Sequence, residues 1–130
     1  MARDIITVNL PVQEATKSVE CKAFDKQTVT VANGIQVKDA LGNKNNSLVI
    51  IIEPTAQSTG SVIFKAGDNY PNSMLGDLTV TPTAGKVNAY LLDDISRFEN
   101  RDNTVNIDFG TGFAGTIYAV AKRAGLEPVA

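Results

Sequence analysis

The chain has 130 residues, 43% of them hydrophobic and 20% charged, and this length and composition predict one globular domain. Its net charge of -2 argues against electrostatic capture of nucleic acid. Histidine is absent, which excludes the Ser-His-Asp and Cys-His catalytic arrangements and His-ligated zinc. We therefore expect no enzyme, no cofactor and no bound metal.

The first residues differ in pattern from the rest of the chain. Ile5, Ile6, Val8 and Leu10 are apolar, and a polar stretch follows Pro11. A terminal segment of this composition is either the edge strand of its own domain or an arm that pairs with a neighbouring subunit. We assign residues 1–18 to this arm or edge segment and residues 19–130 to the folded domain.

Short runs of β-branched and aromatic residues recur between turn-forming residues and predict strands. The runs are Val19 to Phe24, Thr28 to Val31, Ile35 to Val37, Leu48 to Ile52, Val62 to Phe64, Leu78 to Val80, Val87 to Leu91, Val105 to Phe109 and Thr116 to Val120. No stretch of helical length keeps a 3.6-residue apolar period, and the best remaining helix candidate is Leu91 to Asn100. The pattern predicts an all-β fold: a single antiparallel β-sandwich or jelly-roll-like domain.

Cys21, in the first of these runs, is the only cysteine, so no internal disulfide can form. Alternation places it on an apolar strand face, where a small buried hydrophobe is expected. The amino terminus lacks the layout of a secretion signal, and the longest apolar run, Leu48 to Ile52, is too short to cross a bilayer. We expect a protein made in a reducing cytoplasm, without membrane attachment.

A turn is expected at Asn33-Gly34. A two-residue loop would set apolar residues opposite polar ones, whereas a three-residue loop, Ala32 to Gly34, sets Val31 opposite Ile35. The second apolar pair, Val29 with Val37, then shares the same face. This hairpin predicts a positive φ at its glycine.

Two later strands have informative patterns. The run Leu48 to Ile52 is continuously apolar, which predicts a central strand covered on both faces. By contrast, the residues of Val105 to Phe109 alternate between apolar and polar, which predicts a strand with one face in water.

The segment Gly110 to Gly115 formally matches the G-x-G-x-x-G dinucleotide fingerprint. Too few residues follow it for the crossover helix and second strand of a dinucleotide-binding fold. We interpret the segment as a glycine-rich hairpin that joins the last two strands.

Several carboxylates are candidate metal ligands or catalysts. Those considered for calcium are Asp68, Asp77, Asp93, Asp94, Asp102 and Asp108. Their spacing fits no EF-hand loop, so solvated turn carboxylates are the simpler interpretation. Glycoside hydrolysis by an Asp or Glu pair is disfavoured because aromatic platforms for sugar are scarce. Arg97 is expected to form a structural ion pair with a carboxylate such as Asp108.

A larger pattern extends from Val62 to the Lys122 region. Its segments are Val62 to Asn69, Gly76 to Val80, Ile95 to Phe98 and Thr104 to Phe109. The residues that define it are Lys65, Gly67, Asp68, Gly76, Asp77, Arg97, Phe98, Asp108, Gly112 and Gly115. This pattern resembles small virion proteins of tailed phages that act as head decoration, or capsid cement, proteins.

The resemblance implies a non-enzymatic structural protein that binds the major capsid protein on the outer surface of the virion and stabilises the shell. It also implies a homo-oligomer, with a trimer as one form, that is produced in the cytoplasm of a bacterial host. Two alternatives stay open: a tail or head–tail connector component, and a carbohydrate- or surface-binding β module. The expected capsid or subunit contacts are Ile5, Ile6, Val8 and Leu10.

Overall fold

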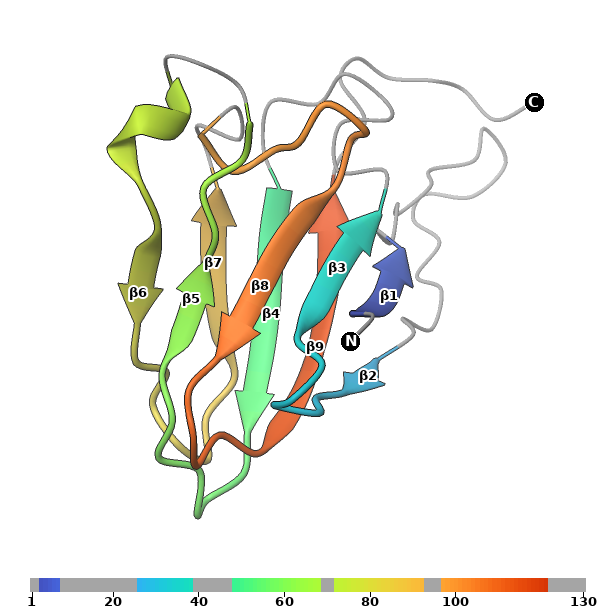
Figure 1. Ribbon diagram of the computed structural model, residues 1–130. Helices are drawn as coiled ribbons and strands as arrows, with labels where there is room; N and C mark the ends of the chain where they lie inside the picture. Colours follow the sequence, from blue (N-terminus) through green and yellow to red (C-terminus); the bar gives the residue numbers. More distant parts are fainter. Residues whose placement is uncertain (1–2, 8–25, 39–47, 69–71, 93–96, 122–130) are drawn as a thin grey trace, which may run out of the picture.

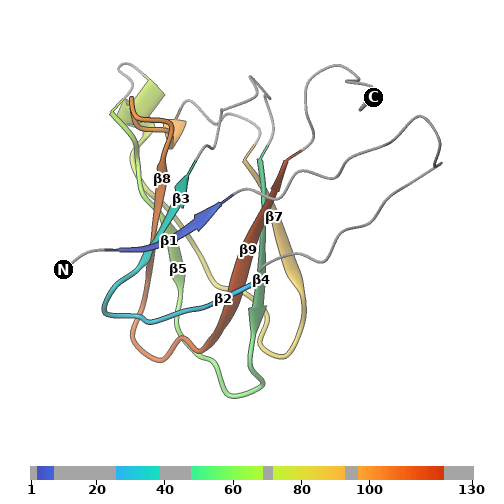
Figure 2. The ribbon, with the colours of Figure 1, turned by 90° about the vertical axis from the view of Figure 1, so that its right-hand side faces the viewer.

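The protein is an all-β domain of two stacked sheets in a computed structural model (Figure 1). The structure describes residues 3–7, 26–38, 48–68, 72–92 and 97–121. Figure 2 views the two layers edge-on, with the core between them. This arrangement confirms the predicted all-β, antiparallel-rich single domain.

The first sheet has five strands in the order β1-β3-β8-β5-β6. Their bounds are β1, Asp4–Thr7; β3, Ile35–Lys38; β8, Val105–Phe109; β5, Val62–Phe64; and β6, Leu78–Val80. All neighbours in this sheet are antiparallel except β1 and β3, which are parallel. Residues 4–7 of the terminal segment therefore form an edge strand of the domain itself, and the boundary at residue 18 lies outside the described residues.

The second sheet has four strands in the order β2-β9-β4-β7, and all its pairings are antiparallel. Their bounds are β2, Gln27–Thr28; β9, Gly115–Ala121; β4, Leu48–Pro54; and β7, Asn88–Leu92. Strand β4 is central, as predicted. A short 3-10 helix, η1 (Asn72–Leu75), precedes β6 at one end of the sandwich.

The core lies between the sheets and is built from the inward-facing half of each strand. Its largest fully buried side chains are Phe64, Ile35, Leu48, Ile50, Ile52, Ile107, Ile117, Val37, Val62 and Val105. Burial of each such side chain contributes about 1.5–3 kcal/mol, so strand alternation is the main determinant of the fold. One aromatic contact joins the layers, because the ring of Phe64 in β5 meets that of Tyr90 in β7 edge to face. The Phe64 ring also meets that of Phe98, in the segment before β8, edge to face.

Most predicted strands are confirmed, several with the same bounds. The alternation expected in β8 is present: Val105, Ile107 and Phe109 are buried, while the residues between them are half-buried. Strand β4 departs from its prediction on one point. Its continuous apolar run is buried on one face only, and Val49 and Ile51 on the other face are half-buried.

The predicted hairpin around Asn33-Gly34 is wrong in its pairing. The turn is present, since the main-chain N–H groups of Asn33 and Gly34 both donate to the carbonyl of Thr30, and Gly34 has the expected positive φ of 70°. However, β2 pairs with β9 and β3 pairs with β8, so the two flanking strands belong to different sheets. The turn therefore carries the chain from one layer to the other.

The segment Gly110 to Gly115 likewise links the layers instead of closing a hairpin, because β8 and β9 lie in different sheets. It lies at the end of the sandwich opposite η1, together with the β4–β5 and β6–β7 connections (Figure 1). Main-chain hydrogen bonds hold this end together, including Thr59 N–H to Gly112 O at 3.0 Å and Gly110 N–H to Ser61 O at 2.8 Å.

The weak helix candidate Leu91 to Asn100 forms no α-helix where the chain can be described, in keeping with the predicted all-β fold. Leu91 and Leu92 belong to β7, and Glu99 forms a β-bridge with Val105. The strand predicted at Val19 to Phe24, which includes Cys21, lies outside the described residues. Within the described ranges, no helix is long and apolar enough to cross a membrane.

Candidate functional site

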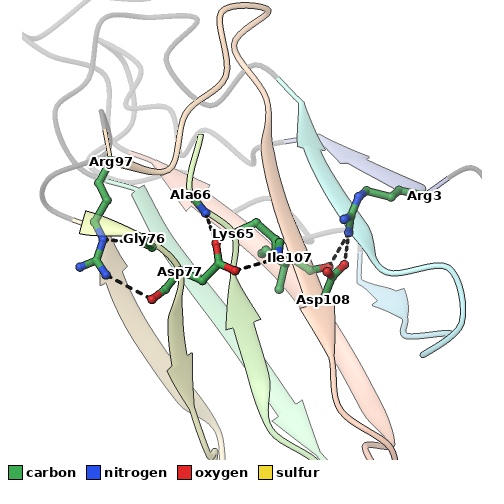
Figure 3. Close-up of polar contacts among 8 residues, drawn as sticks. All are labelled: Arg3, Lys65, Ala66, Gly76, Asp77, Arg97, Ile107 and Asp108. Carbon is green, nitrogen blue, oxygen red and sulfur yellow. Dashed lines mark hydrogen bonds and ion pairs between the residues drawn. The ribbon is translucent and has the colours of Figure 1, made fainter. Parts of the chain in front are cut away.

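Charged side chains of alternating sign lie across the outer face of the five-stranded sheet (Figure 3). We call them the charge row; in spatial order they are Arg3, Asp108, Lys65, Asp77 and Arg97. Arg3 directly precedes β1, Asp108 is in β8, and Lys65 directly follows β5. The other two residues precede strands: Asp77 comes directly before β6, and Arg97 lies in the segment before β8. Four of the five, all but Arg3, belong to the larger sequence pattern that extends from Val62.

Asp77 is bound by two neighbours on the segment that follows β5. Its Oδ2 pairs with Lys65 Nζ at 2.7 Å, and its Oδ1 accepts the main-chain N–H of Ala66 at 2.7 Å. The hydrogen bond from Lys65, followed by that from Ala66, lowers the pKa of Asp77. The same hydrogen bond raises the pKa of Lys65. This ion pair ties the start of β6 to the end of β5.

Arg97 holds the same turn from its other side. Its guanidinium donates to three consecutive carbonyls, those of Leu75 at 3.3 Å, Gly76 at 3.0 Å and Asp77 at 3.3 Å. The prediction that Arg97 pairs with Asp108 is wrong, because Asp108 pairs with Arg3 instead. The planar fork of arginine suits a row of carbonyls, so Arg97 acts as a main-chain brace.

Arg3 and Asp108 occupy the far end of the charge row. The Arg3 guanidinium pairs with the Asp108 carboxylate and also donates to the carbonyl of Ile107 at 3.1 Å. Gly34 makes this approach possible, since a Cβ there would lie 2.6 Å from Arg3 Nη1 and 3.0 Å from Asp108 Oδ1. This contact fixes the start of β1 to the sheet.

Gly67 and Phe98 join the brace to the core. The Gly67 N–H donates to the carbonyl of Arg97 at 2.9 Å, and a Cβ on Gly67 would lie only 2.0 Å from the carbonyl oxygen of Glu99. Phe98, the residue after Arg97, is buried and packs against Phe64. The Arg97 guanidinium lies 4.9 Å from the centroid of the Phe98 ring. The position of Arg97 is thus set by close main-chain packing.

The braced turn exposes apolar side chains. Met74 is 71% exposed and Leu75 is 65% exposed, and Leu78 at the start of β6 is 37% exposed. We call these three residues the η1 corner. Exposed large apolar groups on a fixed frame are typical of protein-binding surfaces. Sequence reasoning missed Met74 and Leu75, because no strand or turn pattern distinguishes them from buried residues.

The carboxylates considered for calcium are engaged separately. Asp68 accepts the main-chain N–H of Arg101 at 2.8 Å, and Asp102 accepts the hydroxyl of Thr104 at 2.5 Å. Asp77 and Asp108 are in the charge row, and Asp93 and Asp94 lie outside the described residues. Among the residues that can be described, no three His, Cys, Asp or Glu side chains form a metal-binding group.

The predicted contact residues of the terminal segment fall into three classes. Ile5 is 59% exposed and free to meet a partner, whereas Ile6 is 8% exposed and packs in the core. A core position does not suit a capsid contact, so the expectation for Ile6 is corrected. Val8 and Leu10 lie outside the described residues.

The ten residues of the larger sequence pattern lie in three places. Asp108 lies on the outer face of the five-stranded sheet, where it pairs with Arg3. The seven residues near the η1 corner are Lys65, Gly67, Asp68, Gly76, Asp77, Arg97 and Phe98. Gly112 and Gly115 are at the opposite end, in the link between β8 and β9. The pattern therefore describes a structural frame, and the η1 corner is what that frame presents to solvent. No family model, curated protein or solved structure matches the chain.

Proposed function

We propose that the protein is a non-enzymatic structural component of a phage virion, which binds the outer surface of the capsid and stabilises the shell. The observation that carries this proposal is the η1 corner, where the side chains of Met74 and Leu75 are exposed to solvent. The turn that carries them is held in place by the Lys65–Asp77 ion pair and by hydrogen bonds from Arg97. Residues that resemble a decoration-protein pattern thus build a rigid apolar contact surface. The partner is the major capsid protein.

The mechanism of stabilisation is interface burial repeated over a lattice. Removing a Met or Leu side chain from water contributes about 1.5–3 kcal/mol. Because the turn is already fixed by hydrogen bonds, little conformational entropy is lost when it docks. Each copy that touches adjacent capsid subunits adds contacts that must break before the shell opens, and a homo-oligomer multiplies this effect through avidity.

The chemistry of the η1 corner favours this role over a carbohydrate-binding module. Sugar-binding sites commonly use exposed aromatic faces, whereas the exposed groups here are aliphatic or thioether side chains. Of the described aromatic residues, Phe64, Phe98, Phe109 and Phe113 are buried in the core.

Co-sedimentation with expanded phage shells that lack this protein tests the proposal. Wild-type protein should bind saturably, at a fixed number of copies per capsid subunit. The variant Met74→Asp should weaken binding by about ten- to a hundredfold, since the buried apolar contact is replaced by a charge that must be desolvated.

The matched control is Val87→Asp. Val87 is 67% exposed, similar to Met74, but it lies in the β6–β7 connection at the opposite end of the sandwich (Figure 1). This variant should bind shells like the wild type. Absence of wild-type binding to expanded shells would contradict the proposed function. Equal losses in the two variants would contradict only the η1 corner as the contact surface.

A further inference from the structure

Strand β7 is an open edge of the four-stranded sheet. Within the described part of the chain, it pairs with β4 alone, over Asn88–Leu92. Every second residue of an edge strand directs its main-chain N–H and C=O groups away from the sheet, where another strand can bond to them. In Figure 1, β7 lies beside β4 in the rear layer, as the last strand of its sheet.

The other three edges are short or carry charge, whereas β7 has neither protection. Strand β2 has two residues, β6 has three, and β1 contains Asp4. Strand β7 has five residues, Asn-Ala-Tyr-Leu-Leu, with no charge and no proline. Natural sheets commonly use charges, prolines or short strands to prevent edge pairing. The absence of these features in β7 indicates an edge that accepts a strand.

The solvent face beside this edge is apolar. Leu91, 59% exposed, lies opposite Val49 of β4, and the exposed Ala89 lies opposite Ile51. The same two β4 residues lie opposite Val120 and Tyr118 of β9. The apolar face therefore continues across three strands and reaches the open edge.

An ion pair lies at the β2 side of this face. Lys26 Nζ pairs with Glu53 Oε2 at 2.9 Å, and the same ammonium lies 5.4 Å from the ring centroid of Tyr118.

We propose that β7 pairs antiparallel with β7 of a second copy of this chain around a twofold axis, joining two four-stranded sheets into one. Pairing of all five residues centres the axis on Tyr90. Ala89 then lies opposite Leu91 of the other copy, so a small side chain faces a large one in both symmetric positions. This complementarity identifies the second copy as the occupant of the edge.

The pairing buries Leu91 and extends the apolar face over both copies. A twofold pairing gives a dimer, and it would replace the trimer that the resemblance implies. The inference does not depend on capsid binding, because the dimer would form in the free protein.

Sedimentation equilibrium of the full chain, over a dilution series, tests this interface with two charge variants. In Ala89→Lys with Leu91→Lys, each new lysine lies opposite a lysine of the other copy. In Ala89→Lys with Leu91→Glu, each lysine lies opposite a glutamate. Both variants place charges at the same exposed positions, so their effects on the folding of one copy are similar, and circular dichroism checks this.

We expect the wild type to be a dimer and the lysine–lysine variant to dissociate to monomers. The lysine–glutamate variant should dimerise at least about tenfold more tightly than the lysine–lysine variant, because two opposite-charge pairs replace two like-charge pairs. That difference should shrink at high salt.

Three results would overturn the proposal. A wild-type protein that is monomeric throughout the dilution series would show that the edge is unoccupied or is covered by the same chain. A trimer would show a different interface. Equal association of the two charge variants would show that β7 lies outside the contact.

Discussion

Replacement of Gly67 by alanine tests whether close main-chain packing sets the position of Arg97. The added Cβ would lie 2.0 Å from the Glu99 carbonyl oxygen and 2.5 Å from its carbon. Real Cβ contacts essentially never fall below 3.0 Å, so the two segments must separate by about 1 Å. This shift would also break the 2.9 Å hydrogen bond from Gly67 N–H to Arg97 O.

The expected loss follows from these two effects. Overpacking of this kind costs about 1–3 kcal/mol, and loss of the main-chain hydrogen bond costs about 1 kcal/mol more. Gly67→Ala should therefore lower the free energy of unfolding by about 2–4 kcal/mol.

Gly76→Ala is the matched control. Gly76 has a φ of 78°, and a Cβ there would meet no atom within 4 Å. Alanine at this positive φ costs about 1–2 kcal/mol in backbone strain, with no steric clash. Part of that cost is offset because alanine lowers the conformational entropy of the unfolded chain. The net loss should be about 1 kcal/mol.

Urea unfolding, followed by circular dichroism, compares the two variants with the wild type. Gly67→Ala should have a clearly lower midpoint than Gly76→Ala at an unchanged slope. If Gly76→Ala is as destabilising as Gly67→Ala, or more so, the packing argument for the position of Arg97 is refuted.

Three further predictions concern the charge row and the core. Asp77→Asn should lower the melting temperature most above about pH 5. The pKa of Asp77 is lowered in the folded protein, so its stabilisation is complete above the unfolded-state pKa of about 3.9 and is lost as pH falls through the folded-state pKa. A pH-independent difference would contradict the ion pair with Lys65. Phe64→Ala should cost about 3–5 kcal/mol in urea unfolding, since its fully buried ring also contacts Tyr90 edge to face; a loss under 1 kcal/mol would count against its central position. Arg97→Lys should weaken shell binding while the charge is kept, because one ammonium cannot span three carbonyls; shell binding equal to that of the wild type would show that the brace is dispensable.

Local sequence patterns predicted the strands well but not their partners. Runs such as Val62 to Phe64 combine β-branched or aromatic residues with alternating burial, and such runs form strands in any β-sandwich. The sequence does not predict that β2 pairs with β9 and β3 with β8, because a hairpin turn and a crossover between layers look alike in sequence. Gly34 has a positive φ in either case.

The candidate site was only partly predictable for a similar reason. Lys65, Asp77 and Arg97 belong to one sequence pattern, but their contacts depend on segments that are distant in sequence. Arg97 could be assigned to a carboxylate or to carbonyls, and only the fold places it beside the turn at Gly76. The exposure of Met74 depends on a 3-10 turn that no hydrophobic period predicts.

Cryo-electron microscopy of expanded phage shells saturated with the purified protein would show directly whether the η1 corner docks on the outside of the shell, as we propose. We expect sandwich-shaped density on the outer surface, with Met74 and Leu75 against the capsid lattice. Shells without added density would contradict capsid binding, and density whose η1 corner faces away from the shell would contradict the docking surface.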